Sequence, residues 1–138
     1  MMPTNTNKKD GNRFEADLCK TLFDHGFWAH NMAQNKDGQP ADIIAAKHGK
    51  PFLIDCKVCS GCGFNINRIE ENQELSMKLW SECGNGSGWF AIRIEDEIYM
   101  VSYPVITAYA HTKRLCMLSK AVIHDLGIPL ERWLEICV

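Results

Sequence analysis

Two acids and a lysine stand where buried strands would ordinarily carry aliphatic side chains. Asp42 lies within the apolar residues 41–44, and Asp55 and Lys57 lie within the apolar residues 52–58. Side chains alternate between the two faces of a strand, so Asp55 and Lys57 share one face. Placing charged groups on an otherwise hydrophobic ribbon costs desolvation free energy, and such a cost usually marks a functional site.

If the two apolar runs pair as an antiparallel hairpin, Asp42 lies across from the face of Asp55 and Lys57. Two converging carboxylates form the hard-oxygen site that Mg²⁺ or Mn²⁺ prefers, and the backbone carbonyl of Cys56 is a further candidate ligand. Such a metal polarises a phosphodiester and lowers the pKa of a bound water. Lys57 is then placed to orient that water or to stabilise developing negative charge.

Each of these residues also has an ordinary structural interpretation. Asp55 and Lys57 would form a surface ion pair if their strand lay at a sheet edge. Asp42 would be a capping acid near a turn. Glu15 would be the solvated flank of a helix, and Gln73 would either contact a metal-bound water or make a plain buried hydrogen bond.

The elements that must position these residues follow from hydrophobic periodicity. Phe14, Leu18 and Leu22 recur every four residues and predict a helix over residues 11–25, with Cys19 and Phe23 widening its apolar stripe. Strands are predicted over 27–33, 41–47 and 51–58, and the last two form a hairpin across the turn His48–Gly49. Residues 34–39 are predicted to be a polar loop.

A second helix is predicted over residues 69–83. Its apolar stripe contains Ile69, Gln73, Met77 and Trp80, with Leu75 and Leu79 beside it. A loop over 60–67 precedes this helix. Strands at 89–94 and 98–102 and short helices at 104–110 and 129–136 follow it, and the remainder beyond residue 112 has no assignment. This order of elements predicts the α/β class, with one mixed sheet flanked by helices.

Bulk composition bounds the organisation of the chain. Its 138 residues are 46% hydrophobic, which predicts a single folded domain over 11–138 after a flexible tail over 1–10. We expect a cytoplasmic protein, because no stretch resembles a membrane span or a signal peptide. The net charge of −2 does not by itself indicate DNA binding. However, a metal bound by the acids of residues 1–57 would leave that part of the chain positive.

The ordered set Glu15, Asp42, Asp55-x-Lys57 and Gln73 resembles the PD-(D/E)xK nuclease superfamily, over about residues 8–103. The resemblance implies a restriction-endonuclease-like αβββαβ core. It is closer to the small Holliday junction resolvases of the archaeal Hjc type and the bacterial and phage RecU type. The chain departs from the pattern in having its proline at residue 40 and an aspartate as the second acid. Its short loop over 31–39 is closer to the Hjc type than to the stalk of RecU.

The resemblance implies a metal-dependent, structure-selective endonuclease that resolves four-way DNA junctions by paired nicks, with Mg²⁺ as cofactor and Mn²⁺ as a substitute. It also implies a two-fold symmetric homodimer on branched or duplex DNA. Another nuclease of the same fold (restriction, nicking or repair type) and a non-catalytic DNA-binding module are the alternatives. The implied catalytic residues are Glu15, Asp42, Asp55, Lys57 and Gln73; the metal ligands are Glu15, Asp42, Asp55 and Cys56; and the DNA contacts are Lys8, Lys9, Arg13, Lys36 and Arg68. Candidate apolar residues for the dimer contact are Trp89, Phe90, Trp133 and Leu134.

The seven cysteines are an odd number in a chain without a secretion signal, so reduced thiols are expected. Cys56, Cys59 and Cys62 have the spacing C-x-x-C-x-x-C, which also fits a zinc or iron–sulfur cluster. Because Cys56 faces the core from a strand, the three thiolates would not converge easily, and buried or loop thiols are the alternative. His30 and His48 are not expected to be ligands.

Overall fold

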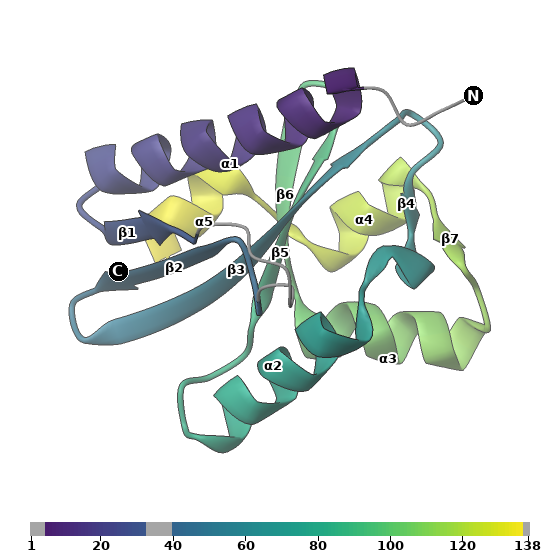
Figure 1. Cartoon of the computed structure of the whole chain (residues 1–138). Helices are drawn as coiled ribbons and strands as arrows, with labels where there is room; N and C mark the ends of the chain where they lie inside the picture. Colours follow the sequence, from purple (N-terminus) through teal and green to yellow (C-terminus); the bar gives the residue numbers. More distant parts are fainter. Residues whose placement is uncertain (1–4, 33–39, 137–138) are drawn as a thin grey trace.

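A six-stranded sheet lies at the centre of the structure, with its strands in the order β1-β2-β3-β5-β6-β8 (Figure 1). The structure is a computed structural model that describes residues 5–32 and 40–136, with the backbone alone for residues 5–8. Strands β3 and β5 are parallel neighbours, whereas the other neighbouring pairs are antiparallel. The sheet is therefore mixed, as predicted. Its strands are β1 (Trp28–Asn31), β2 (Ile43–Lys47), β3 (Lys50–Cys59), β5 (Trp89–Ile94), β6 (Glu97–Ser102) and β8 (Ile128–Pro129).

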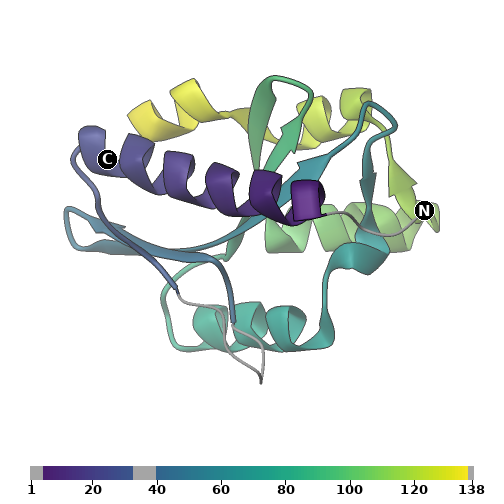
Figure 2. The same cartoon turned by 45° about the horizontal axis from the view of Figure 1, so that its top comes forward.

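Helices cover both faces of this sheet. Figure 2 shows α1 and α5 on one side of the sheet and α2 on the other. The predicted order of one helix, three strands, a second helix and two strands is confirmed for the large sheet and its helices. The short strand β4 (Phe64–Asn65) and the turn η1 (Ile66–Arg68) lie before the second helix, and further elements follow β6. The helices are α1 (Asn5–Asp24), the 3₁₀ turn η1 (Ile66–Arg68), α2 (Glu71–Glu82), α3 (Tyr103–Lys113), α4 (Lys120–Leu126) and α5 (Leu130–Ile136).

The hairpin of β2 and β3 has the register that brings the acids together. Ile43 pairs with Ile54, so Asp42 lies just beyond the last pair of this ladder, next to Asp55. The predicted turn at His48 and Gly49 is present, with positive φ angles of 50° and 78°. Two successive left-handed residues are the geometry of the tight turn that matches strand twist.

The sheet separates two hydrophobic cores. The first lies under α1 and α5, where Phe14, Leu18 and Leu22 pack against Ile54 and Trp133. The second lies under α2, α3 and α4, and its buried residues include Phe64, Met77, Phe90, Ile106 and Ile123. Along β3, Phe52 and Ile54 belong to the first core, whereas Leu53 belongs to the second. This alternation directs Asp55 and Lys57 toward α2.

Three sequence predictions about the helices need correction. Helix α1 begins at Asn5 rather than near residue 11, because neither the lysines nor Gly11 breaks the helix; an interior glycine costs only about 1 kcal/mol. Phe23 is 64% exposed, so it does not widen the buried stripe. In α2, Leu75 and Leu79 are 57% and 50% exposed, because each lies two residues from the buried Met77 and thus on the opposite side of the helix.

The chain after Thr112 contributes buried residues to both cores. From the sequence, only a final helical turn or two is predicted in this part of the chain. A two-stranded sheet pairs β7 (Met117–Leu118) with β4 (Phe64–Asn65), which lies within the predicted loop over 60–67. Phe90, Trp133 and Leu134 are buried in the cores rather than exposed, so three of the four candidates for the dimer contact are wrong. No described helix combines the length and the hydropathy that a membrane crossing requires.

Candidate active site

Asp55 and Lys57 lie where β3 pairs within the sheet only with β5, because the ladder to β2 ends at Ile54. Both residues are nevertheless buried, so the interpretation of this pair as a surface ion pair is wrong. Asp55 is fully buried and Lys57 is 8% exposed. The Lys57 Nζ atom lies 3.1 Å from Asp55 Oδ2. A buried ion pair of this kind is rarely a device for stability, because desolvation offsets most of the attraction.

The Lys57 ammonium is surrounded by three acceptors from three different elements. Besides Asp55 on β3, Nζ donates to the backbone carbonyl of Arg68, at the end of η1, at 3.1 Å. It also donates to Gln73 Oε1, on α2, at 3.2 Å. Two of the three N–H donors of the ammonium are used in these hydrogen bonds, and Asp55 adds an ion pair. The position of this nitrogen is therefore fixed from three sides.

Gln73 holds both members of the ion pair. Its Nε2 donates to Asp55 Oδ1 at 3.1 Å, and its Oε1 accepts from Lys57. The same Oε1 accepts from the backbone N–H of Glu70, at the start of α2, at 3.2 Å. The buried hydrogen bond is thus the interpretation that the structure supports, and contact with a metal-bound water stays a prediction. Glu70 was not singled out from the sequence, although an acid three residues before a glutamine is the signature of a capping box.

Asp42 connects the end of β2 to β3. Its backbone N–H donates to the carbonyl of Ile54 at 3.1 Å, and its Oδ2 accepts from the backbone N–H of Cys56 at 2.8 Å. Its side chain is therefore bound to the neighbouring strand, and Asp42 is not a turn cap. Asp42 is 7% exposed, so this charge too has been taken out of water.

The three carboxyl groups form one cluster with Asp42 in the middle. Asp42 makes side-chain hydrogen bonds with Glu15 from α1 and with Asp55 from β3. Burial, the charge of Asp42 and its hydrogen bond raise the pKa of Glu15 to about 7, against the opposing effect of Lys57. Burial raises the pKa of Asp55 to about 8; Lys57 opposes this shift and Asp42 adds to it. Glu15 is therefore a member of the site and not a solvated flank.

The donor set fits a hard divalent cation. Asp55 Oδ2 is buried and has no hydrogen-bond partner among the described residues, although the Lys57 ammonium lies close to it. The raised pKa values of Glu15 and Asp55 favour the protonated forms of these carboxyl groups. Across the described part of the chain, no three His, Cys, Asp or Glu side chains are arranged as a ready-made metal cage. Ionisation of these carboxyl groups would provide the negatively charged oxygen atoms that such an ion requires.

The cysteine run does not converge. Cys56 packs with the core under α1, whereas Cys59 belongs to the core on the opposite face of the sheet. Cys62 is exposed in the following loop. Burial and the surrounding carboxylates raise the pKa of the Cys56 thiol well above its usual value. A high pKa disfavours the thiolate form that metals bind.

The basic residues expected to contact DNA differ in what the structure shows of them. Lys9 and Arg13 are exposed on α1, and Arg13 makes a solvent-exposed ion pair of 3.9 Å with Asp17. Arg68 is exposed but hydrogen-bonded to β3. Lys36 and the side chain of Lys8 lie outside the described residues. The contacts of all five with DNA stay predictions.

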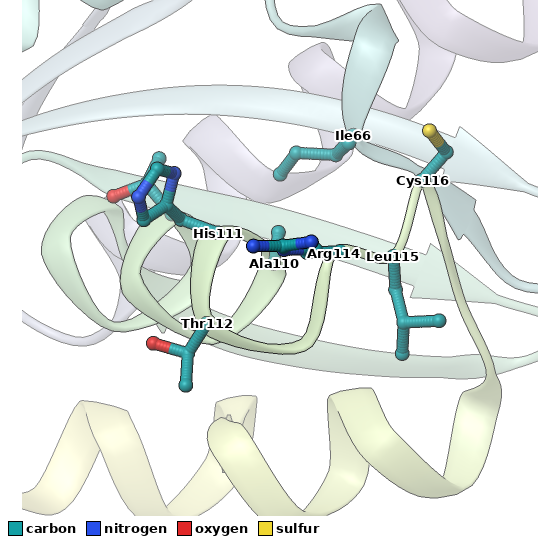
Figure 3. Close-up of a pocket in the computed structure, with 8 residues that line it drawn as sticks. Ile66, Ala110, His111, Thr112, Arg114, Leu115 and Cys116 are labelled. Atoms are coloured by element: carbon teal, nitrogen blue, oxygen red, sulfur yellow. The ribbon is translucent and has the colours of Figure 1, made fainter.

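Two cavities are lined by residues near the ends of β3 and α3. One, of about 580 Å³, adjoins the carboxyl cluster between the start of α1 and the end of β3, and its lining includes Gly11, Cys56 and Arg68. The other, of about 660 Å³, lies at the end of α3, where Arg114 and His111 border it near Ile66 (Figure 3). The predicted site residues Cys56 and Arg68 line the first cavity, whereas no predicted site residue lines the second.

Fold and site together define a nuclease-like α/β domain with a carboxylate–lysine centre. Residues 6–137 match the family model of the archaeal Holliday junction resolvase (Hjc), and the chain belongs to this family. It is 28% identical over 94 residues to the crossover junction endodeoxyribonuclease Hjc of Methanocaldococcus jannaschii. The aligned residues make up 68% of this chain and 66% of that relative, which is slightly less than two thirds of the relative's length. The structure of Archaeoglobus fulgidus Hjc, a Holliday junction resolvase, has a similar fold, with a TM-score of 0.68 at 16% identity over 90% of this chain and 99% of that one.

Proposed function

We propose that this chain is a metal-dependent endonuclease that resolves four-way DNA junctions by paired nicks. The observation that carries the proposal is the buried Asp55–Lys57 pair beside Asp42 and Glu15, in a chain of the Hjc family. A buried lysine among carboxyl groups is costly for folding and useful for phosphodiester hydrolysis. The relatives named above as a crossover junction endodeoxyribonuclease and as a Holliday junction resolvase support the choice of substrate.

Each residue has a role in this proposal. Mg²⁺, held by Glu15, Asp42, Asp55 and the carbonyl of Cys56, would polarise the phosphodiester and lower the pKa of a bound water. Lys57 provides a fixed positive charge beside the phosphate, where it stabilises the negative charge that develops during hydrolysis. Gln73 holds the side chains of Asp55 and Lys57 in fixed positions relative to each other, since it is hydrogen-bonded to both.

A substrate panel tests the proposal directly. Equal amounts of duplex, nicked, flap and four-way DNA are incubated with the protein and Mg²⁺, and the cut sites are mapped on denaturing gels. Symmetric paired nicks confined to the four-way substrate are expected. Equal cutting of linear duplex would instead indicate another nuclease of the same fold. Binding in EDTA without cleavage in any metal would indicate a non-catalytic DNA-binding module.

A metal site at these carboxyl groups predicts an unusual dependence of stability on pH. The folded-state pKa values of Glu15 and Asp55, about 7 and about 8, lie above the ordinary values of 4.5 and 3.8. In EDTA the unfolded chain therefore releases protons that the folded chain retains, and the free energy of unfolding falls as the pH rises from about 5 to 8. We expect thermal denaturation in EDTA to show a Tm that decreases over this range.

Added Mg²⁺ is expected to raise the Tm, and to raise it more at pH 8 than at pH 5, because the ion binds the ionised carboxylates. A double variant, Glu15→Gln with Asp55→Asn, is the control and should lose both the pH dependence and the response to Mg²⁺. A response to Mg²⁺ that is equal at both pH values would contradict the assignment of the ion to this cluster.

The symmetry of the substrate suggests a homodimer, since two strands are cut. Leu75 and Leu79 are large exposed apolar residues four positions apart, on the face of α2 opposite Met77. We propose this face as the contact between two copies. Light scattering should give a dimer mass for the native chain and a monomer mass for Leu79→Glu. Val105→Glu, at an exposed apolar residue of α3, should remain dimeric.

A further inference from the structure

We propose that Arg68 is a positioning residue for Lys57 and does not bind a DNA phosphate. This inference rests on the proposed nuclease function, and it replaces the expectation from sequence that Arg68 contacts the DNA backbone. The main-chain carbonyl of Arg68 accepts a hydrogen bond of 3.1 Å from Lys57 Nζ. The location of this carbonyl therefore helps to determine where the ammonium lies.

The guanidinium of Arg68 is bound to the strand that carries Lys57. Its Nη1 atom donates to the carbonyl of Val58 at 2.9 Å and lies 3.4 Å from Cys59 Sγ. The guanidinium carbon lies 5.9 Å from the centre of the Phe64 ring, within the range of a cation–π contact. The side chain thus fastens the end of η1 to β3 next to Lys57, while the main chain of the same residue accepts from Lys57.

The attachment extends to the second acceptor of Lys57. Residues 68–73 run from the end of η1 into the first turn of α2, and they supply two of the three acceptors of the ammonium, the carbonyl of Arg68 and Oε1 of Gln73. Gln73 is itself held by the backbone N–H of Glu70 in the same segment. A shift of residue 68 would therefore displace both acceptors together.

Strand β3 needs such an attachment at this point. The ladder between β2 and β3 ends at Ile54, so from Asp55 to Cys59 strand β3 pairs within the sheet only with β5. The side chains of Asp42 and Arg68 bind the β3 backbone in this stretch, at Cys56 N–H and at the Val58 carbonyl. The two contacts lie on either side of Lys57 in the sequence.

Arg13 differs from Arg68 in that its guanidinium is not bound to a strand. Its side chain is 83% exposed, and its ion pair with Asp17, at 3.9 Å, is at the limit of such contacts. A residue of that kind can turn to a phosphate at little cost. Arg68 would first have to give up its bonds to Val58 and Cys59.

The test compares arginine variants in two assays, junction binding in EDTA over a range of salt concentrations and single-turnover cleavage in Mg²⁺. For Arg68→Ala we expect a cleavage rate at saturating protein at least about 10-fold lower, because a small misplacement of a catalytic group costs up to about 100-fold. Its Kd and the slope of log Kd against log salt should stay unchanged. Arg13→Ala should reduce that slope by about 1, as expected for loss of one phosphate contact. Arg132→Ala, at an exposed residue of α5, should change neither.

Arg68→Lys separates positioning from charge. A lysine preserves the positive charge that a phosphate would bind, but it lacks the planar fork that reaches Val58 and Cys59 together. We expect Arg68→Lys to cleave as slowly as Arg68→Ala while binding normally. Far-UV circular dichroism and the Tm would confirm that both variants are folded. If either variant is unfolded, the comparison uses the other one.

Three results would overturn the inference. They are a weaker Kd with a smaller salt slope in Arg68→Ala, rescue of cleavage by Arg68→Lys, and a native cleavage rate in both variants. If the native protein itself cut no DNA, the proposed function would fail, and crystal structures would still decide the positioning role. Lys57 Nζ should leave Arg68 O and Gln73 Oε1 in the structure of Arg68→Ala, and an unmoved Lys57 would refute the inference.

Discussion

Replacing Lys57 with alanine is expected to reduce junction cleavage about 100- to 1,000-fold, the cost of removing one fixed charge-stabilising group from an active site. The ammonium is buried with three acceptors, so no nearby side chain can take its place without rearrangement. Single-turnover rates measured with saturating protein would show the loss as a change in rate and not in affinity. Asp55→Asn is expected to lose cleavage as well, because the amide cannot provide an anionic ligand.

Both variants are expected to stay folded and to bind junction DNA in EDTA. Burial raises the pKa of Asp55 and so lowers the cost of a neutral group at this position, and an amide is such a group. Full cleavage by Lys57→Ala and Asp55→Asn would remove the basis for the site. Loss of DNA binding along with cleavage would show that the pair holds the fold or the substrate and not the chemistry.

Trp133→Ala is expected to destabilise the protein by about 3–5 kcal/mol, the usual cost of truncating a buried tryptophan. Trp133 is fully buried in the core under α1 and α5, and its ring packs against Phe27, Phe52 and Trp89 at centroid distances of 5.8, 5.3 and 5.7 Å. The free energy of unfolding would be measured by urea denaturation at pH 6, with unchanged m-values as the check on two-state behaviour.

Two further variants test whether the loss of stability in Trp133→Ala comes from the buried ring. Ile136→Ala lies in the same helix but at a residue 50% exposed, and it should cost less than about 1 kcal/mol. Trp133→Phe should cost much less than Trp133→Ala, because it preserves most of the ring contacts and removes an indole N–H that has no partner among the described residues. Equal losses for Trp133→Ala and Ile136→Ala would mean that α5 is not part of the cooperative core.

The central part of the fold could be predicted from sequence because its periodicities are strong and local. Phe14, Leu18 and Leu22 have the spacing of one helix face, and the β2–β3 hairpin has alternating apolar residues around a tight turn. These features also placed Asp42 beside Asp55. A one-residue error in that register would have moved Asp55 and Lys57 to the face of α1, so agreement on the register is what made the site predictable.

The rest depended on long-range packing that periodicity does not encode. Trp133 and Phe90 are as apolar as any interface residue. Trp133 is buried in the core under α1 and α5, and Phe90 is buried in the core under α2, α3 and α4, and both cores are completed by residues remote in sequence. The sequence predicts that Leu75 and Leu79 lie beside the buried stripe of α2, whereas both are exposed. Which face of this helix is covered depends on neighbours remote in sequence. The role of the Arg68 carbonyl had no sequence signal, since any residue has a carbonyl.

The three acceptors around Lys57 have a consequence for how substrate can approach. Asp55, Arg68 and Gln73 surround this ammonium at 3.1, 3.1 and 3.2 Å, so an incoming phosphate meets a group that already has three internal partners. In the proposed role of Lys57, contact with DNA would be an exchange, in which one internal partner is released as the phosphate oxygen is taken up. We expect such an arrangement to discriminate against stray anions, because a small ion would not compensate for the partner it displaces as well as a whole DNA backbone would.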